Sequence, residues 1–254
     1  TCMDDLRTAL ARLVDETPSA QDRGRPRLWV DRVFAAKGSG TVVTGTLTGG
    51  AVQVDDQLHA AGRPVRVRGI QSHGERHDAI GPGNRVALNL VGVDHTDLQR
   101  GDAVVVPAHW RPTRRFDASL QVLASLTHDV SRRGAYVAYI GSGEFPVRLR
   151  VLGSERIPPG GSGMVRLHLD SASSRGDLPL VRGDRFVLRE SGRDETVGGG
   201  EVLDVQPVLP ASKARPDHEV DRVVAEHGWI DADDLVALTG ERRDPTLGRW
   251  VVAP

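Results

Sequence analysis

The sequence predicts a mainly β protein: two consecutive small β-barrels, a short N-terminal helix, and the beginning of a winged-helix unit at the C-terminal end. Three observations predict this architecture. Short runs rich in Val, Thr and Ile fill residues 27–107, the same pattern returns over 114–208, and apolar residues at helical spacing replace it after Pro210. Glycines between the runs supply the tight corners that a small closed barrel requires.

The N-terminal residues 1–25 predict a helix followed by a polar linker. Leu6, Leu10 and Leu13 recur at helical spacing, so one face of the helix is apolar. A single helix of this length is marginal in water unless its apolar face packs against something. We therefore expect it to be the last helix of a domain that lies upstream.

The first barrel is expected over residues 26–108. Residues 64–68 and 85–90 alternate cleanly between apolar and polar side chains, as half-buried strands do. Arg66 and Arg68 should therefore share one face of a strand, and Arg85 and Asn89 should share a face of another.

The second barrel is expected over residues 109–208. It repeats the pattern of the first, and Arg182-Gly183-Asp184 leads into a strand as Arg100-Gly101-Asp102 does. We expect the glycine run 198–200 to form a tight β-turn, because no helical pattern follows that could place a phosphate at a helix N-terminus.

In the remaining segment, 209–254, the alternating strand pattern gives way to a helical one. Val220, Val223 and Val224, and then Leu235 and Leu238, sit at helical spacing, and a short apolar run starts at Trp250. Helix, helix and strand in this order are how a small winged-helix unit begins.

Composition and missing motifs limit the function. The chain has 254 residues, a net charge of −1 and one cysteine, Cys2, so an intrachain disulfide is excluded and bulk capture of nucleic acid is disfavoured. No phosphate-binding loop motif and no catalytic triad are signalled, and His73 and His77 have no third ligand nearby. We expect no catalytic site, metal or cofactor within this chain.

The sequence contains no apolar run long enough to cross a membrane and no signal peptide, so we expect a cytoplasmic protein. We also expect a monomer.

Several motifs resemble those of SelB, the selenocysteine-specific branch of the translational GTPases. They lie at residues 28–34, 37–47, 83–90, 183–189 and 196–200. General elongation factors share the Gly-Thr-Val-Val-Thr-Gly core at 40–45 but usually lack the preceding pair Asp31-Arg32. The resemblance implies two barrels that correspond to domains II and III of these factors. It also implies that GTP and magnesium bind in an N-terminal domain that this chain does not include.

The resemblance implies an aminoacyl pocket on the first barrel made by Asp31, Arg32 and Arg85. The chemistry is reasonable, because a selenol ionises at neutral pH and arginine offers a permanent charge with fixed donors. Asp31 could hold one guanidinium group and repel other anions. Adjacent strand residues point to opposite faces, so Asp31 and Arg32 can share a pocket only at a strand end or a bulge.

The implied partners are selenocysteinyl-tRNA, the ribosome and, through winged helices mostly absent here, a hairpin in the messenger RNA. The implied function is selenocysteine incorporation at UGA codons during protein biosynthesis. Candidate tRNA contacts are Lys37, Arg66, Arg68, Tyr139, Arg148 and Arg150. The alternative interpretation is the barrel pair of a general translational GTPase or of an ATP sulfurylase-associated GTPase. Convergence of Asp31, Arg32 and Arg85 on one surface distinguishes the two.

Overall fold

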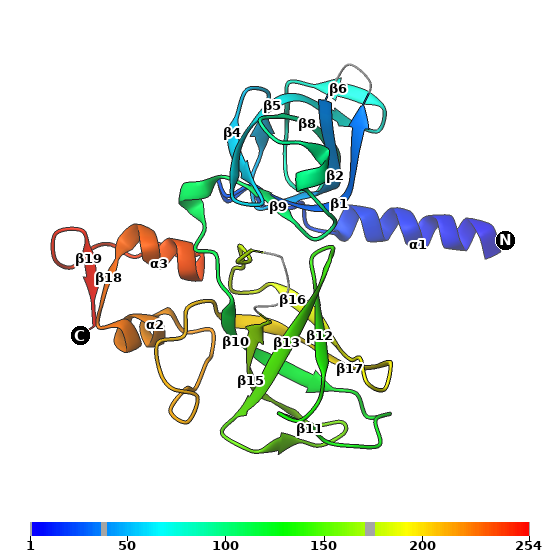
Figure 1. The fold of residues 1–254 in the computed structure, drawn as a ribbon. Coiled ribbons are helices and arrows are strands. Elements are labelled where there is room, and N and C mark those ends of the chain that lie inside the picture. Colours follow the sequence, from blue (N-terminus) through cyan, green and yellow to red (C-terminus); the bar gives the residue numbers. More distant parts are fainter. Residues whose placement is uncertain (1, 37–39, 171–175, 254) are drawn as a thin grey trace.

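The computed structural model describes residues 2–36, 40–170 and 176–253, and it contains two β-barrels in series, a small C-terminal unit and one N-terminal helix. Figure 1 shows the first barrel above the second, with the C-terminal unit beside the junction between them. The prediction of a mainly β protein with two consecutive barrels is confirmed.

The first barrel is a closed ring of six antiparallel strands in the order β4-β9-β1-β2-β8-β5, and pairing between β4 and β5 closes it. The strands are β1 (Arg27–Ala36), β2 (Gly40–Thr48), β4 (Gln57–Ala60), β5 (Arg63–Ser72), β8 (Arg85–Val91) and β9 (Ala103–Val105). Smaller elements decorate the ring: β3 (Val52–Gln53) paired with β7 (Ala79–Ile80), β6 (Glu75–His77) and the 3-10 turn η1 (His95–Asp97).

Strict alternation of side chains fills the first barrel. On β2, Val43 and Leu47 are fully buried, while Thr44 and Thr46 between them face outward. Burying a valine or leucine side chain contributes roughly 1.5–3 kcal/mol. The outward-facing positions can therefore carry polar side chains without disturbing the packing of the core.

The second barrel is also closed, in the order β10-β15-β13-β12-β16-β17. Its strands are β10 (Arg115–Val122), β12 (Tyr136–Ile140), β13 (Gly143–Leu152), β15 (Ser162–Leu169), β16 (Arg185–Glu190) and β17 (Glu195–Asp204), and β11 (Val130–Ser131) pairs with β14 (Arg156–Ile157) beside them.

The turn predicted at residues 198–200 is wrong. These glycines lie inside β17, where the strand passes very close to β10. A Cβ atom on Gly200 would sit 1.8 Å from the carbonyl oxygen of Ser119, and one on Gly198 would sit 2.1 Å from that of Gln121. The glycines therefore serve close strand packing rather than a chain reversal.

The two barrels meet around a cluster of arginine and tryptophan side chains. Arg27 donates two hydrogen bonds, of 2.7 and 2.6 Å, to the carboxylate of Asp184, and its guanidinium group lies 5.0 Å from the Trp29 ring centre and 4.8 Å from that of Trp110. Trp29 belongs to the core of the second barrel although it lies on β1. The connector that carries Trp110 includes the 3-10 turn η2 (Pro107–His109).

The C-terminal unit has the order α2 (Val220–His227), β18 (Trp229–Asp231), α3 (Ala232–Thr239) and β19 (Trp250–Val252). The two helices and the strand at Trp250 match the sequence prediction, but β18 between the helices was not predicted. It pairs antiparallel with β19, and so closes the unit with a small two-stranded sheet.

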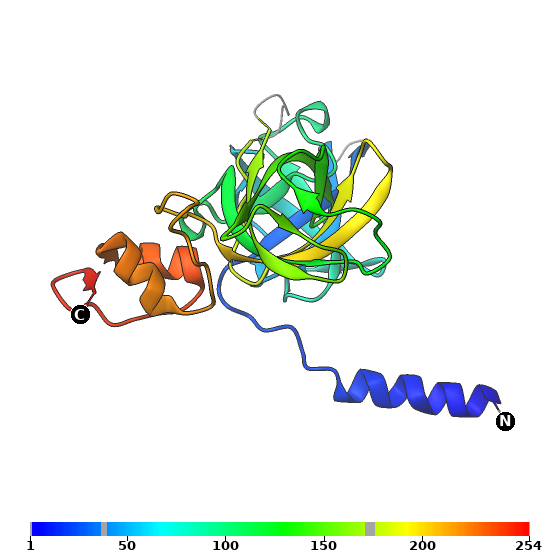
Figure 2. The same cartoon turned by 90° about the horizontal axis from the view of Figure 1, so that it is seen from below.

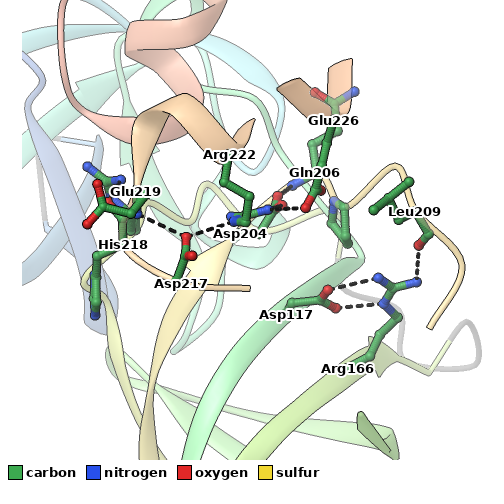
Figure 3. A network of polar contacts seen from close by, with 12 residues as sticks. Asp117, Arg166, Asp204, Gln206, Leu209, Asp217, His218, Glu219, Arg222 and Glu226 are labelled. Atoms are coloured by element: carbon green, nitrogen blue, oxygen red, sulfur yellow. Dashed lines mark hydrogen bonds and ion pairs between the residues drawn. The ribbon is translucent and has the colours of Figure 1, made fainter. Parts of the chain in front are cut away.

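A network of ion pairs fixes α2 on the second barrel (Figure 3). Arg222 on α2 pairs with Asp204 of β17 at 3.1 Å and with Asp217 at 2.9 Å. Nearby, Arg166 donates two hydrogen bonds, of 2.6 and 2.8 Å, to the buried carboxylate of Asp117 and a third to the carbonyl of Leu209 at 2.8 Å. These contacts join the barrel, the following linker and the helix.

The N-terminal helix α1 (Cys2–Glu16) has no buried residue. In both views it projects away from the barrels (Figures 1 and 2). Its apolar side chains, among them Leu6, Leu10 and Leu13, are about half exposed or more. None of the helices in the described part of the chain is long and apolar enough to cross a membrane.

Candidate functional site

A β-bulge in β1 places two neighbouring charged residues on the outer surface of the first barrel. Val30 pairs with Gly45 of β2 and Arg32 pairs with Thr44, so Asp31 is the extra residue between them. Val30 is fully buried, Asp31 is half-buried, Arg32 is exposed. Two adjacent strand residues can contribute to one site only at a strand end or a bulge, and here the bulge turns both Asp31 and Arg32 outward.

The carboxylate of Asp31 is held at both oxygens. The Thr44 hydroxyl donates to Oδ1 at 2.5 Å, and the guanidinium group of Arg85 pairs with Oδ2. Thr44 lies on β2 and Arg85 on β8, so the chain of contacts crosses three adjacent strands. A charge-assisted pair with both carboxylate oxygens engaged has a defined orientation.

Arg32 differs from Arg85 in its contacts. Within the described part of the chain, no hydrogen bond or ion pair engages its guanidinium group. Asp31 balances the charge of Arg85, whereas no carboxylate among the described residues pairs with Arg32. The surface thus carries one net positive charge beside a fixed ion pair, an arrangement that suits a small anion. The Arg85 side chain is 55% exposed, so the site is an open surface rather than a closed pocket.

The candidate contacts on the first barrel lie apart from this cluster. Arg66 and Arg68 share the outer face of β5 as predicted, and Arg68 is itself the extra residue of a bulge between Val67 and Gly69. Arg66 pairs with Asp55, whereas no such partner is found for Arg68 in residues 2–36, 40–170 and 176–253. Lys37 lies outside the described residues.

The candidate contacts on the second barrel fall on two surfaces. Arg148 and Arg150 are exposed on the outer face of β13. Arg150 lines an open hollow of about 1020 Å³ that four more arginines also line: Arg132, Arg133, Arg156 and Arg215. Of these, Arg156 is paired with Asp129 at 3.0 Å. The acidic residues lining the hollow are Asp129 and Glu155, so its net charge is positive.

Arg148 faces His168 on β15, and His168 also faces Arg115 on β10. Burial lowers the pKa of His168 below its usual 6.5, and the charges of Arg115, Arg148 and Arg166 lower it further. The three arginines add to the effect of burial on this pKa, because like charges disfavour protonation.

Tyr139 is half-buried on β12 and lines a different hollow, of about 870 Å³, together with Val187 and Gly199. The turn that follows it contacts the first barrel. Ser142 donates to the carbonyl of Val30 at 2.6 Å, and Arg100 donates to the carbonyl of Ser142 at 2.8 Å. This turn therefore helps to set the position of one barrel on the other.

Side chains that could ligate a metal lie together at one place in the described part of the chain, formed by His128, Glu190 and Glu195. His128 Nε2 lies 2.8 Å from Glu190, and its Nδ1 lies 3.5 Å from Glu195. Glu190 and Glu195 face each other across β16 and β17, and the histidine lies between them. This cluster was not predicted from the sequence. The candidate His77 lies on β6, and His73 precedes that strand.

Thr44 and the pair Arg132-Arg133 were missed from the sequence. Thr44 gave a weak signal, since a threonine facing outward beside a charged pair is a potential donor. The adjacent arginines were a stronger signal, because two like charges before Gly134 mark an exposed loop. Their closeness to Arg150 and Arg215 depends on the barrel and could not be read from the sequence.

Known proteins that this chain resembles include translation elongation factors. The chain is 32% identical over 179 residues to the selenocysteine-specific elongation factor of Desulfomicrobium baculatum and 30% identical over 236 residues to that of Escherichia coli K12. It is homologous to the selenocysteine-specific elongation factors. It is also 32% identical over 189 residues to elongation factor Tu 2 of Streptomyces avermitilis.

These matches cover 70% and 92% of this chain but only 27% and 35% of the two selenocysteine-specific relatives. A crystal structure of a bacterial selenocysteine-specific elongation factor, EF-Sec, matches 95% of this chain and 40% of its own with a TM-score of 0.75 and 22% identity. The apo form of SelB from Methanococcus maripaludis matches with a TM-score of 0.65 and 19% identity over 81% of this chain and 48% of its own. These structures support the fold. No family model matches the chain.

Proposed function

We propose that this chain is the part of a selenocysteine-specific elongation factor that receives selenocysteinyl-tRNA. The observation that carries the proposal is the Thr44–Asp31–Arg85 chain on the first barrel. Beside it lies Arg32, which has no ion-pair partner among the described residues. Asp31, Arg32 and Arg85 are the residues that the family motif selects, and Asp31 and Arg85 come from strands that are not neighbours.

The chemistry of the surface favours a selenol over a hydroxyl. A selenocysteinyl group arrives as an anion at neutral pH, and Arg32 offers a charge that no carboxylate of residues 2–36, 40–170 and 176–253 pairs with. A charge-assisted contact contributes roughly 1.5–3 kcal/mol, which a neutral seryl group would not gain in full. Asp31 limits the site to one extra negative charge, because a larger anion would meet its carboxylate.

The second barrel would contact the RNA backbone of the same ligand. This part of the proposal is supported by the basic hollow that contains Arg132, Arg133 and Arg150, and by the neighbouring Arg148. Phosphate contacts of this kind give affinity without regard to the esterified amino acid. The first barrel would thus read the amino acid and the second would hold the RNA.

A general elongation factor is the second candidate, because the identity to elongation factor Tu 2 is as high as that to the selenocysteine-specific relatives. The two candidates differ in one measurable property. A general factor should protect selenocysteinyl and seryl esters equally, whereas a selenocysteine-specific one should prefer the anion. Ribosome binding, GTP coupling and recognition of a messenger hairpin, which the sequence resemblance implies, are proposals for a longer protein that would contain this chain.

The test compares hydrolysis of the ester bond in selenocysteinyl and seryl RNA minihelices of one sequence, at increasing protein concentration and fixed salt. We expect Arg32→Ala and Arg85→Ala to weaken binding of the selenocysteinyl RNA by roughly 1.5–3 kcal/mol and to leave the seryl RNA nearly unchanged. Arg63→Ala is the matched control, since Arg63 also lies on the first barrel and also pairs with an aspartate, Asp97, at 2.9 Å. Equal losses of affinity for both RNAs would show that Arg32 and Arg85 contact the RNA backbone and do not distinguish the esterified amino acid.

A further inference from the structure

The turn between β12 and β13 docks on the first barrel next to the bulge that carries Asp31. Gly141 and Ser142 form this turn, and Figure 1 shows the hairpin reaching from the second barrel to the first. The indole of Trp29 on β1 packs on Gly141 so closely that a Cβ atom there would lie 2.4 Å from a ring carbon. Gly141 also has a φ of +58°, so only glycine suits this position.

Ser142 is hydrogen-bonded to the peptide unit from which the bulge starts. Its hydroxyl donates to the carbonyl of Val30 at 2.6 Å, and the amide of Gly101 donates to the same oxygen at 2.8 Å. The Nε atom of Arg100 donates to the carbonyl of Ser142 at 2.8 Å and so holds the turn in place. Because a peptide unit is planar, fixing the Val30 carbonyl also fixes the N–H direction and the Cα position of Asp31.

The contact falls at the point where β1 loses its second neighbouring strand. β1 pairs with β9 from Arg27 to Trp29, and the amide of Val30 extends this pairing to the carbonyl of Asp102 at 2.8 Å. From Asp31 onward the pairing that the structure describes for β1 is with β2 alone, and its register shifts at this residue. The extra residue of a bulge has no ladder partner of its own, so its conformation depends on the contacts of the preceding peptide unit.

We propose that Ser142 is a positioning residue through which the second barrel controls the amino-acid selectivity of the first. By holding the Val30 carbonyl, it keeps the bulge in the conformation in which Asp31 pairs with Arg85. A shift of one barrel against the other breaks this hydrogen bond and loosens the pair, so the relative position of the barrels regulates the site. The effect on selectivity rests on the proposed function, whereas the effect on the Asp31–Arg85 pair does not.

The first measurement needs no RNA and follows the side-chain Nε–H signal of Arg85 by NMR in protein with ¹⁵N-labelled arginine. The Asp31→Ala protein gives the position of this signal when the ion pair is absent. We expect Ser142→Ala to move the Arg85 signal part of the way to that position, and Ser142→Thr, which keeps the hydroxyl, to restore it. Ser191→Ala is the matched control, because the Ser191 hydroxyl donates to the carbonyl of Ala135, within the second barrel, at 3.1 Å. An Arg85 signal that Ser142→Ala leaves unmoved overturns the positioning role.

The second measurement is the ester-protection assay with the selenocysteinyl and seryl minihelices. We expect Ser142→Ala to lower the preference for the selenocysteinyl RNA roughly two- to tenfold, the range of one hydrogen bond, and to leave the affinity for the seryl RNA nearly unchanged. Equal weakening of both RNAs, which a merely structural role would give, overturns the effect on selectivity.

Two further comparisons keep the outcome unambiguous. Arg100→Met loosens the same turn without removing the Ser142 hydroxyl, so it should act in the same direction and serves if Ser142→Ala does not fold. A wild-type protein without preference between the two RNAs would contradict the proposed function, and the Arg85 signal would then decide the positioning role by itself.

Discussion

Asp31 on β1 pairs with Arg85 on β8 although β2 lies between their strands. The pair can form because the bulge at Asp31 turns its side chain outward and Thr44 of β2 holds the carboxylate at 2.5 Å. A polar cluster on a barrel surface therefore has its geometry fixed by strand register rather than by a loop. Such a site is preorganised, which favours selectivity over adaptability.

Thr44→Val tests whether Asp31 must be held for selectivity. The change keeps the shape of the side chain and removes the donor to Asp31 Oδ1. We expect selenocysteinyl RNA to bind about 0.5–1.5 kcal/mol more weakly, the value of one hydrogen bond, and seryl RNA to be affected less. The ester-protection assay measures both.

Thr46→Val is the matched control, because Thr46 faces outward on the same strand and carries no such contact to Asp31. If Thr44→Val and Thr46→Val behave alike, the positioning role assigned to Thr44 is wrong.

Arg166→Met should destabilise the second barrel strongly. It leaves the carboxylate of Asp117 buried without its partner, and breaking a buried pair in this way costs about 3–5 kcal/mol. Urea unfolding monitored by circular dichroism gives the free energy of unfolding. The double variant Arg166→Met/Asp117→Leu should recover most of the loss, since neither charge then remains. A double variant as unstable as the single one would show that packing, rather than charge, dominates.

Arg25→Met should loosen the C-terminal unit. Arg25 donates two hydrogen bonds of 2.9 Å to the carbonyls of Val236 and Ala237 on α3, and the loss should cost about 1–3 kcal/mol. Hydrogen exchange should accelerate in α3 and β18 while the first barrel stays protected. Arg23→Met is the control, because the Arg23 side chain is exposed. Unchanged exchange in α3 would contradict the prediction.

His168 should make stability fall in acid. Because burial and nearby arginines lower its folded-state pKa, the unfolded chain binds the proton more tightly. Between the folded-state pKa and 6.5 the unfolded state carries more protons than the folded state. The free energy of unfolding therefore rises with pH across that window and decreases as pH falls through it.

Unfolding free energies measured at several pH values should therefore show a smaller slope for His168→Gln than for the wild-type protein. An RNA phosphate bound near Arg148 should raise the pKa of His168, which an NMR titration with and without RNA can detect. A slope unaffected by the substitution would exclude His168 as its source.

Much of the fold could be predicted because it depends on local patterns. Alternating runs and glycine corners indicated two barrels, and helical spacing indicated α2 and α3. The glycines at 198–200 were wrongly predicted to form a turn, because a glycine run suits both a turn and close strand packing. Only the approach of β17 to Ser119 distinguishes these two structures. The short strand β18 was missed because it depends on its pairing with β19, far along the chain.

The sequence by itself determined which residues are charged, which faces of the strands are apolar, and the family motif that selects Asp31, Arg32 and Arg85. The tertiary structure alone decided that Asp31 is the extra residue of a bulge and that Arg85 reaches it across β2. It also decided that Arg32 has no ion-pair partner in the part of the chain that the structure describes. The physical reason is that side-chain direction follows alternation along one strand, whereas ion pairs depend on the register between strands. A one-residue shift of register would leave the sequence motif intact and destroy the site.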